Sequence, residues 1–253
     1  IPTERVVVRQ GLNEPALLGN HTGGSRNTVG VGTVCHLTAL KLIDQGKARV
    51  AEAWGVEPSQ VAYARGAFTC KEPNKNRALQ ELAGNGMFET IGEGAFGATF
   101  PNDCHVAEVE VDPETGQVTV MSYVTADDFG VIVNDTIVEG QLHGAVLQGA
   151  GQVFGEVAHY DSASGQMLTA SFMDYYLPRA GLIRDINMNH HATPSRVSPL
   201  GVKGMGEAGL TGALPALTNA VLDALRGVGI THLNMPLTPA KIWSAIQAAR
   251  LRG

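Results

Sequence analysis

The stretch "HVAEVEVDPETGQVTVMSYV", residues 105–124, carries the strongest local signal for the fold. Apolar and polar side chains alternate at period two around "DPETG", and this alternation is typical of half-buried strands. Gly116 stands at the turn position where a positive φ favours glycine. The stretch therefore predicts an antiparallel hairpin with one face toward a core.

Helices are expected before and after this hairpin. One should begin near Asn27 or Thr28, with Gly46 as an interruption and Gly55 as a terminator. Residues 137–157 also favour a helix, although each interior glycine costs about 0.5–1 kcal/mol relative to alanine. Another helix or a ligand must therefore approach that helix closely. The tail predicts two more helices, at about 213–226 and 239–249.

Shorter elements complete the expected fold. Further strands are expected at 4–10, 185–192 and 231–234, hairpins at 59–70 and 156–172, and a short helix at 76–84. Strands and helices alternate irregularly, so we predict an α+β fold in two layers rather than a doubly wound sheet. Two α/β subdomains are expected, one from residues 1–100 with the tail and one from residues 101–200.

Composition excludes several classes of protein. The chain has 253 residues, of which 44% are hydrophobic and 17% charged, so it can bury a sizeable core. A net charge of −6 argues against nucleic acid or an anionic membrane surface as partner. No apolar run is long enough to span a bilayer, and we expect no secretory leader. The three cysteines are scattered, which excludes a C-x-x-C metal site and favours a reducing, cytoplasmic location.

The stretch "GVKGMGEAGLTG", residues 201–212, contains a formal G-x-G-x-x-G motif before a helix. A dinucleotide fingerprint would also need a preceding strand and an acid after the next strand. "SPLGVK" is a poor strand, "THLN" ends at Asn234, and Glu207 would repel a pyrophosphate. An NAD-binding domain is therefore disfavoured. Glu207 is either a base acting on a metal-activated water or an ordinary first-turn glutamate.

Other polar residues have two interpretations each. "TGGSRN", residues 22–27, places backbone N–H groups and Arg26 at a helix start, which suits a phosphate but also an ordinary capping turn. Gln141 alone would be a solvated or core-capping glutamine. Asp127 and Asp128 are adjacent on a strand and point to opposite faces, so they favour strand-end capping over a metal chelate.

The chain resembles the molybdenum hydroxylases, the group of xanthine oxidase, aldehyde oxidase and aerobic carbon monoxide dehydrogenase. "PLGVKGMGEAGLTGALPALTNAVLDAL" is similar to the C-terminal signature of that family. Similar segments run in order through nearly the whole chain: "HTGGSRNTVG", "FPNDCHVAEVEVDPETGQVTV", "DDFGVIVN", "VEGQLHGAVLQGAGQ" and "HLNMPLTPAKIWSAI".

The resemblance implies specific roles. Glu207 matches the catalytic base, Lys203, Gly204 and Gly206 belong to its loop, and Gln141 matches a glutamine that bonds the cofactor near the metal. The segment that wraps the pterin is matched by Thr22, Gly23, Gly24, Ser25, Arg26 and Asn27. No residue is expected to bind the metal directly, because the pterin holds the molybdenum.

The resemblance also implies an enzyme of several chains. It would oxidise an electrophilic carbon of an aldehyde, an N-heterocycle or carbon monoxide, with water as the oxygen source. The cofactor would be molybdenum–molybdopterin in its cytosine dinucleotide form, and electrons would pass to iron–sulfur and FAD partner chains. This chain would be the C-terminal part of the molybdopterin-binding subunit, active with its upstream half. The alternative is a non-catalytic cofactor-binding or assembly module.

Overall fold

The computed structural model describes residues 1–11, 19, 21–72, 74–84 and 89–252. The chain divides into two compact units, Ile1–Gly23 with Gly30–Phe96, and Gly24–Val29 with Gly97–Gly253. Each unit holds helices and a three-stranded sheet, so the predicted α+β class is confirmed. The C-terminal tail belongs to the second unit and not with residues 1–100. Within the described residues, no helix has the length and apolar character needed to cross a membrane.

The first unit is built on one long helix. This helix, α1 (Thr33–Trp54), ends at Gly55 with φ 70°. A π-helical stretch, Thr28–Gly32, precedes it, and the first two residues of that stretch belong to the second unit. The expected interruption at Gly46 is wrong, because α1 continues through it. A Cβ at Gly46 would overlap the Phe68 ring, so this glycine admits the ring against the helix.

A small antiparallel sheet packs with α1. Its strands are β1 (Ala62–Ala64), β2 (Ala67–Cys70) and β3 (Lys75–Ala78), in the order β1-β2-β3. The predicted hairpin at 59–70 is confirmed. The short helix α2 (Leu79–Ala83) ends at Gly84 as expected, but the first residues of that prediction form β3 instead.

The predicted strand at residues 4–10 is wrong. The structure has a 3₁₀ turn, Thr3–Arg5, and residues 6–10 are not in a strand. Val7 and Val8 are 76% and 80% exposed. β-branched residues form strands where they pack against a neighbouring strand, and propensity alone does not supply that neighbour.

The second unit contains the predicted hairpin. β4 (Asn102–Val111) pairs with β5 (Val118–Asp128) in antiparallel register, with a bulge between Glu108 and Val109. Gly116 has φ 72° in the turn, and its N–H donates to the Asp112 carbonyl at 2.7 Å. β6 (Asn187–His190) adds a parallel strand beside β5. The hairpin and this strand were both predicted and are confirmed.

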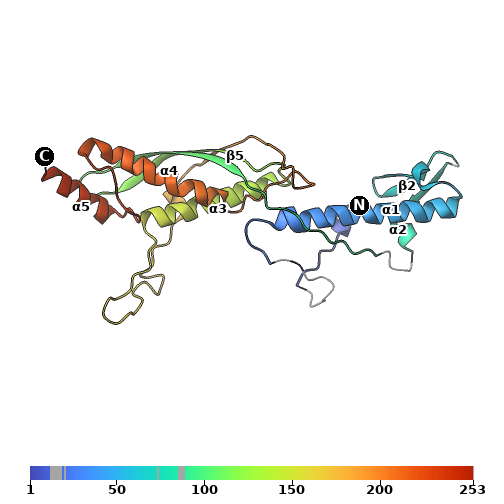
Figure 1. The fold of residues 1–253 in the computed structure, drawn as a ribbon, viewed down its shortest axis with the longest axis horizontal. Helices are drawn as coiled ribbons and strands as arrows, with labels where there is room; N and C mark the ends of the chain where they lie inside the picture. Colours follow the sequence, from blue (N-terminus) through green and yellow to red (C-terminus); the bar gives the residue numbers. More distant parts are fainter. Residues whose placement is uncertain (12–18, 20, 73, 85–88, 253) are drawn as a thin grey trace. The chain divides into compact units, whose positions relative to one another are not determined.

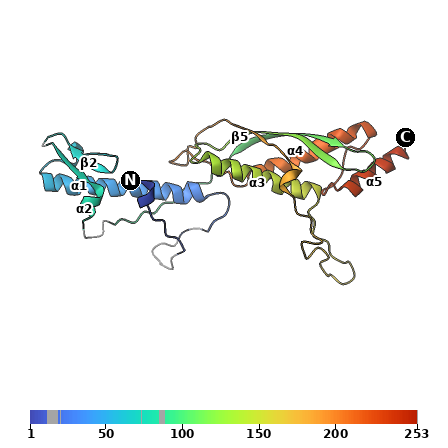
Figure 2. The same ribbon diagram turned by 180° about the vertical axis from the view of Figure 1, so that it is seen from behind.

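Two helices lie side by side along this hairpin. They are α3 (Asp135–Phe154) and α4 (Ala208–Leu225), and both views show the same arrangement (Figures 1 and 2). A third helix, α5 (Pro239–Arg250), follows near the C-terminus. The core between these elements is formed by apolar side chains that include Tyr123, Leu142, Val146, Val153, Ala213, Leu217, Val221, Ile242 and Ile246.

The glycines of α3 have two different surroundings. A Cβ at Gly149 would lie 2.7 Å from the Ala213 Cβ, so α4 is the helix that approaches closely. A Cβ at Gly151 would lie 2.8 Å from Pro178 Cγ, and a Cβ at Gly155 would overlap the Tyr176 ring. Gly140 and Gly144 have open space where a Cβ would be, so packing does not explain them.

Three other expectations for this unit need correction. The predicted hairpin at 156–172 is reduced to one bridge, Tyr160↔Met167, and residues 231–234 form no strand. The helix expected at 213 begins at Ala208, directly after Glu207. Pro215 therefore lies inside α4, where it removes one i→i−4 hydrogen bond.

Candidate active site

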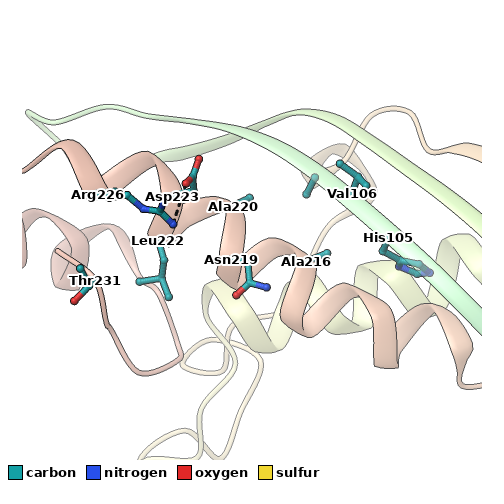
Figure 3. A pocket seen from close by; sticks show the side chains of 10 residues that line it. His105, Val106, Ala216, Asn219, Ala220, Leu222, Asp223, Arg226 and Thr231 are labelled. Carbon is teal, nitrogen blue, oxygen red and sulfur yellow. Dashed lines mark ion pairs between the residues drawn. The ribbon is translucent and has the colours of Figure 1, made fainter. Parts of the chain in front are cut away.

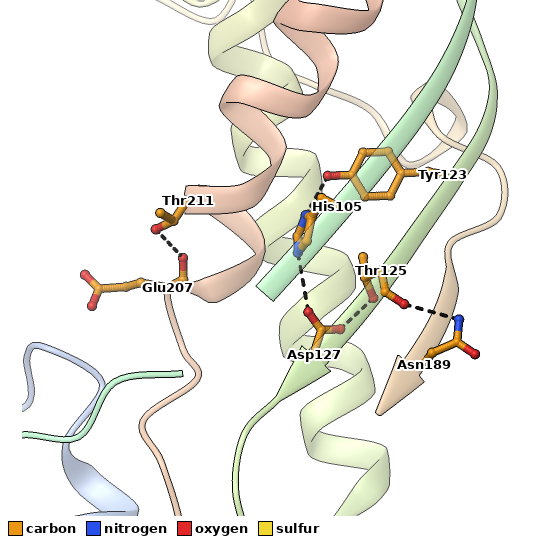
Figure 4. Close-up of polar contacts among 7 residues, drawn as sticks. All are labelled: His105, Tyr123, Thr125, Asp127, Asn189, Glu207 and Thr211. Carbon is orange, nitrogen blue, oxygen red and sulfur yellow. Dashed lines mark hydrogen bonds and ion pairs between the residues drawn. The ribbon is translucent and has the colours of Figure 1, made fainter. Parts of the chain in front are cut away.

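Glu207 stands at the end of the glycine loop, immediately before α4. Its backbone carbonyl accepts hydrogen bonds from the Thr211 N–H and hydroxyl, both at 3.1 Å. Figure 4 shows the side chain directed away from α4. The residue is exposed, and its Oε2 accepts a hydrogen bond from the Ser25 hydroxyl at 3.0 Å. Its carboxylate is therefore accessible to a small molecule while one oxygen is engaged.

Contacts on both sides hold the loop that precedes Glu207. Gln141 Nε2 donates to the Gly206 carbonyl at 2.8 Å, and the Gly204 N–H donates to Thr99 Oγ1 at 3.0 Å. Lys203 Nζ lies 2.7 Å from Asp128 Oδ2. Gln141 was predicted to contact the cofactor, and Lys203 was predicted to belong to the loop. In the structure, Gln141 bonds the backbone of the loop, and the Lys203 side chain joins the loop to Asp128.

Gly204 and Gly206 pack against Ser25. A Cβ at Gly206 would lie 3.0 Å from Ser25 Oγ, and one at Gly204 would overlap the Ser25 carbonyl oxygen. Ser25 itself has φ 55°, next to Gly24 at φ 63°. The structure therefore brings the loop against a residue 182 positions away from Glu207.

The remaining predicted residues surround Ser25 in the sequence. Arg26 and Asn27 are exposed and lead into the helical stretch that begins at Asn27. The Arg26 side chain folds back over Gly24, with Nη2 3.6 Å from the position of a Cβ there. Thr22 and Gly23 belong to the first unit. The cofactor-binding role of the whole segment, residues 22–27, stays a prediction.

Asp128 connects three segments near the site. Its carboxylate accepts hydrogen bonds from the Gly130 N–H and the Thr193 N–H, each at 2.9 Å, and from Lys203. Burial raises the pKa of Asp128, but the hydrogen bonds from Lys203, Thr193 and Gly130 hold that pKa far below its ordinary value. The side chain is therefore a carboxylate at neutral pH, and the predicted strand-end capping is confirmed for Asp128. It is wrong for Asp127, whose carboxylate bonds the Thr125 side chain in the core.

Asp127 points to the opposite side of β5, into the core (Figure 4). Its Oδ2 accepts from the Thr125 hydroxyl at 2.6 Å, and its Oδ1 lies 3.4 Å from His105 Nε2. That second pair is within ion-pair distance but is not aligned as a hydrogen bond. His105 and Asp127 have side chains only 1% and 2% exposed, so they form a buried polar pair.

Tyr123 completes this buried group. Its hydroxyl lies 2.8 Å from His105 Nδ1. Burial and the Asp127 charge both raise the pKa of Tyr123, so the hydroxyl stays protonated and can donate to Nδ1. No sequence motif marks His105, although it occupies a core-facing position of the alternating stretch with Ala107 and Val109.

A groove of about 620 Å³ lies between β4 and α4 (Figure 3). His105 and Val106 line one side, and Asn219 and Asp223 line the other. Its lining shares no residue with the predicted cofactor site. Over the part of the chain that the structure describes, no three His, Cys, Asp or Glu side chains gather closely enough to hold a metal ion.

Known proteins resemble this chain over most of its length. Residues 1–184 match the molybdopterin cofactor-binding domain family. The chain is 30% identical over 263 residues to the carbon monoxide dehydrogenase large chain of Hydrogenophaga pseudoflava, covering 99% of this chain and 33% of that protein. It is 45% identical over 143 residues to the nicotine 6-hydroxylase large subunit of Paenarthrobacter nicotinovorans, covering 56% and 17%.

Solved structures show the same similarity. The crystal structure of Cu,Mo-CO dehydrogenase superimposes with a TM-score of 0.78 at 26% identity, covering 92% of this chain and 31% of that chain. Quinoline 2-oxidoreductase from Pseudomonas putida 86 has a TM-score of 0.78 at 28% identity, covering 89% and 30%. The chain thus spans about a third of the length of the carbon monoxide dehydrogenase and quinoline oxidoreductase chains. These matches confirm the resemblance to molybdenum hydroxylases.

Proposed function

The chain belongs to the molybdopterin cofactor-binding domain family, and we propose that it forms part of a molybdenum hydroxylase in which Glu207 is the catalytic base. The observation that supports this role most directly is the exposed Glu207 carboxylate, held by Ser25 at the end of a glycine-rich loop. Glycines leave little side-chain bulk around the carboxylate, so a small substrate can approach it.

The residues around Glu207 suit an anionic pterin cofactor. Arg26 carries a guanidinium, and the segment from Gly24 leads into the start of a helix, where backbone N–H groups and the helix dipole suit an anion. These groups would hold the phosphates of a molybdopterin in its cytosine dinucleotide form, and Gln141 would contact the cofactor near the metal. The bound molybdenum centre would supply the two-electron redox chemistry.

Glu207 contributes the proton transfer. A carboxylate positioned within hydrogen-bond reach can take a proton from the attacking water as the nucleophile forms. The substrate is a small molecule with an electrophilic carbon, as the names of the carbon monoxide, nicotine and quinoline enzymes suggest.

The active assembly contains more than this chain. The similar proteins include large chains and large subunits, of which this chain spans about a third or less. It works with the remaining molybdopterin-binding segment and with iron–sulfur and FAD subunits that carry electrons away. The enzyme is cytoplasmic.

The test is Glu207→Gln in the assembled complex. Glutamine keeps the shape of the side chain but cannot accept the proton, so reduction by substrate in a single turnover should slow by about 10³-fold or more. Molybdenum content should stay at the wild-type level. The free energy of unfolding should change by at most about 1 kcal/mol, the size of a charge effect at a helix start.

Glu110→Gln is the matched control, because Glu110 is an exposed glutamate on β4. It should be reduced at the wild-type rate. If Glu207→Gln with full molybdenum were also reduced at the wild-type rate, Glu207 would be an ordinary helix-start residue, and the non-catalytic module would become the better interpretation.

A further inference from the structure

We infer that Ser25 is a positioning residue that orients the Glu207 carboxylate through its hydroxyl. This inference rests on the proposed role of Glu207 as the base. A carboxylate can only accept hydrogen bonds, so the 3.0 Å contact has Ser25 Oγ as donor and Glu207 Oε2 as acceptor. With Oε2 engaged, Oε1 is the oxygen that accepts the proton from the nucleophile.

The backbone at Ser25 indicates that its side chain has a function. Ser25 and Arg65 are the only non-glycine residues with positive φ among those that the structure describes. Arg65 precedes Gly66 in the β1–β2 turn, where a left-handed residue is ordinary. Ser25 lies outside any hairpin, and glycine would suit its φ of 55° better. A strained residue whose side chain contacts the proposed base points to a role in the site.

The glycine loop is shaped around this serine. Gly204 leaves room for the Ser25 carbonyl oxygen, and a Cβ at Gly206 would come within 3.0 Å of the hydroxyl. On its other side, the Gly206 carbonyl is held by the Gln141 amide at 2.8 Å. The peptide before Glu207 is therefore held between Gln141 and Ser25, which leaves the carboxylate little freedom to turn away.

Two substitutions separate positioning from a backbone role. Ser25→Gly removes the hydroxyl and relieves the left-handed strain, so the assembled protein should unfold at the same or a higher temperature. Its single-turnover rate should nevertheless fall about 10–100-fold, the effect of a misplaced reacting group, with KM and molybdenum content near wild type. Ser25→Thr keeps the hydroxyl but is more strained at positive φ, so it should unfold at a lower temperature and retain a rate closer to wild type.

Arg65→Gly is the matched control for relief of left-handed strain, and its rate should equal that of the wild type. If Ser25→Gly lost molybdenum in proportion to its rate, Ser25 would hold the cofactor and the inference would be wrong. If Ser25→Gly turned over at the wild-type rate while Glu207→Gln did not, only the positioning role would fail. A wild-type rate for Glu207→Gln would instead remove the proposed function, and the inference with it.

Discussion

Asp127 and Asp128 are neighbours at the end of β5, yet they serve two different regions of the second unit. The Asp127 side chain is buried in the core with His105, Tyr123 and Thr125. Asp128 faces the loops and holds Lys203, just before Gly204 and Glu207. Alternation along a strand separates the two side chains, so one carboxylate supports the hairpin and the other supports the candidate site.

The difference predicts two kinds of defect. Changes on the core side should lower the stability of the fold. Changes on the loop side should also displace the Glu207 loop, because Lys203 is part of it. Three substitutions test this division, in order of decreasing expected effect.

Asp127→Ala should have the largest effect. It leaves two buried donors, the Thr125 hydroxyl and the neutral His105 ring, facing a void in the core, and each buried donor without an acceptor costs about 1–3 kcal/mol. Thermal or urea unfolding of the assembled protein should show this loss. The fraction that remains folded with cofactor should turn over at a normal rate; a large loss of rate there would place the core pair in the catalytic machinery.

Lys203→Met should have an intermediate effect. Methionine keeps the apolar stem but leaves the Asp128 carboxylate without its cation, and a hydrogen bond to a charged group contributes about 1.5–3 kcal/mol. Turnover should also fall, because the loop loses the side-chain contact between Lys203 and Asp128. If the free energy of unfolding fell by this amount while turnover stayed unchanged, the ion pair would have no part in placing Glu207.

The pH dependence of Lys203→Met sharpens the comparison. The pKa of Asp128 is lowered in the folded protein, so the stability it contributes is complete above its ordinary pKa and is lost as the pH falls toward the folded value. The stability difference between wild type and Lys203→Met should therefore be full at neutral pH and shrink below about pH 4. Urea unfolding measured from neutral pH to below about pH 4 checks this. If Lys203 acted without Asp128, the stability difference between the two proteins would stay constant over that range.

Asp223→Ala should have the smallest effect. Asp223 forms an ion pair with Arg226 at 3.3 Å at the edge of the groove in Figure 3, and both side chains are more than 70% exposed. Exposed ion pairs contribute about 0–1 kcal/mol, and neither region described above depends on this pair. A marked loss of stability or turnover would mean that Asp223 contributes through the groove and not only through its ion pair with Arg226.

Local patterns predicted the elements whose neighbours in space are also neighbours in sequence. The β4–β5 hairpin is one case, because the alternation and the Gly116 turn lie within a single stretch. The helices α3 and α5 are others. The prediction of a strand at residues 4–10 failed because a strand also needs a partner strand. The start of α4 was predicted at about residue 213 and not at Ala208, because Pro215 lies within the helix.

Local sequence patterns were enough to predict the α+β class, the hairpin, the opposite directions of Asp127 and Asp128, and the position of Glu207 in a glycine-rich loop before a helix. These features depend on periodicity and backbone conformation over a few residues. Three contacts are visible only in the folded chain: Ser25 with Glu207, Lys203 with Asp128, and His105 with Asp127 in the core. Ser25 is 182 positions from Glu207 and Lys203 is 75 positions from Asp128, so no local pattern could place either pair together. His105 and Asp127 lie on paired strands, but their burial depends on the core that packs against the hairpin.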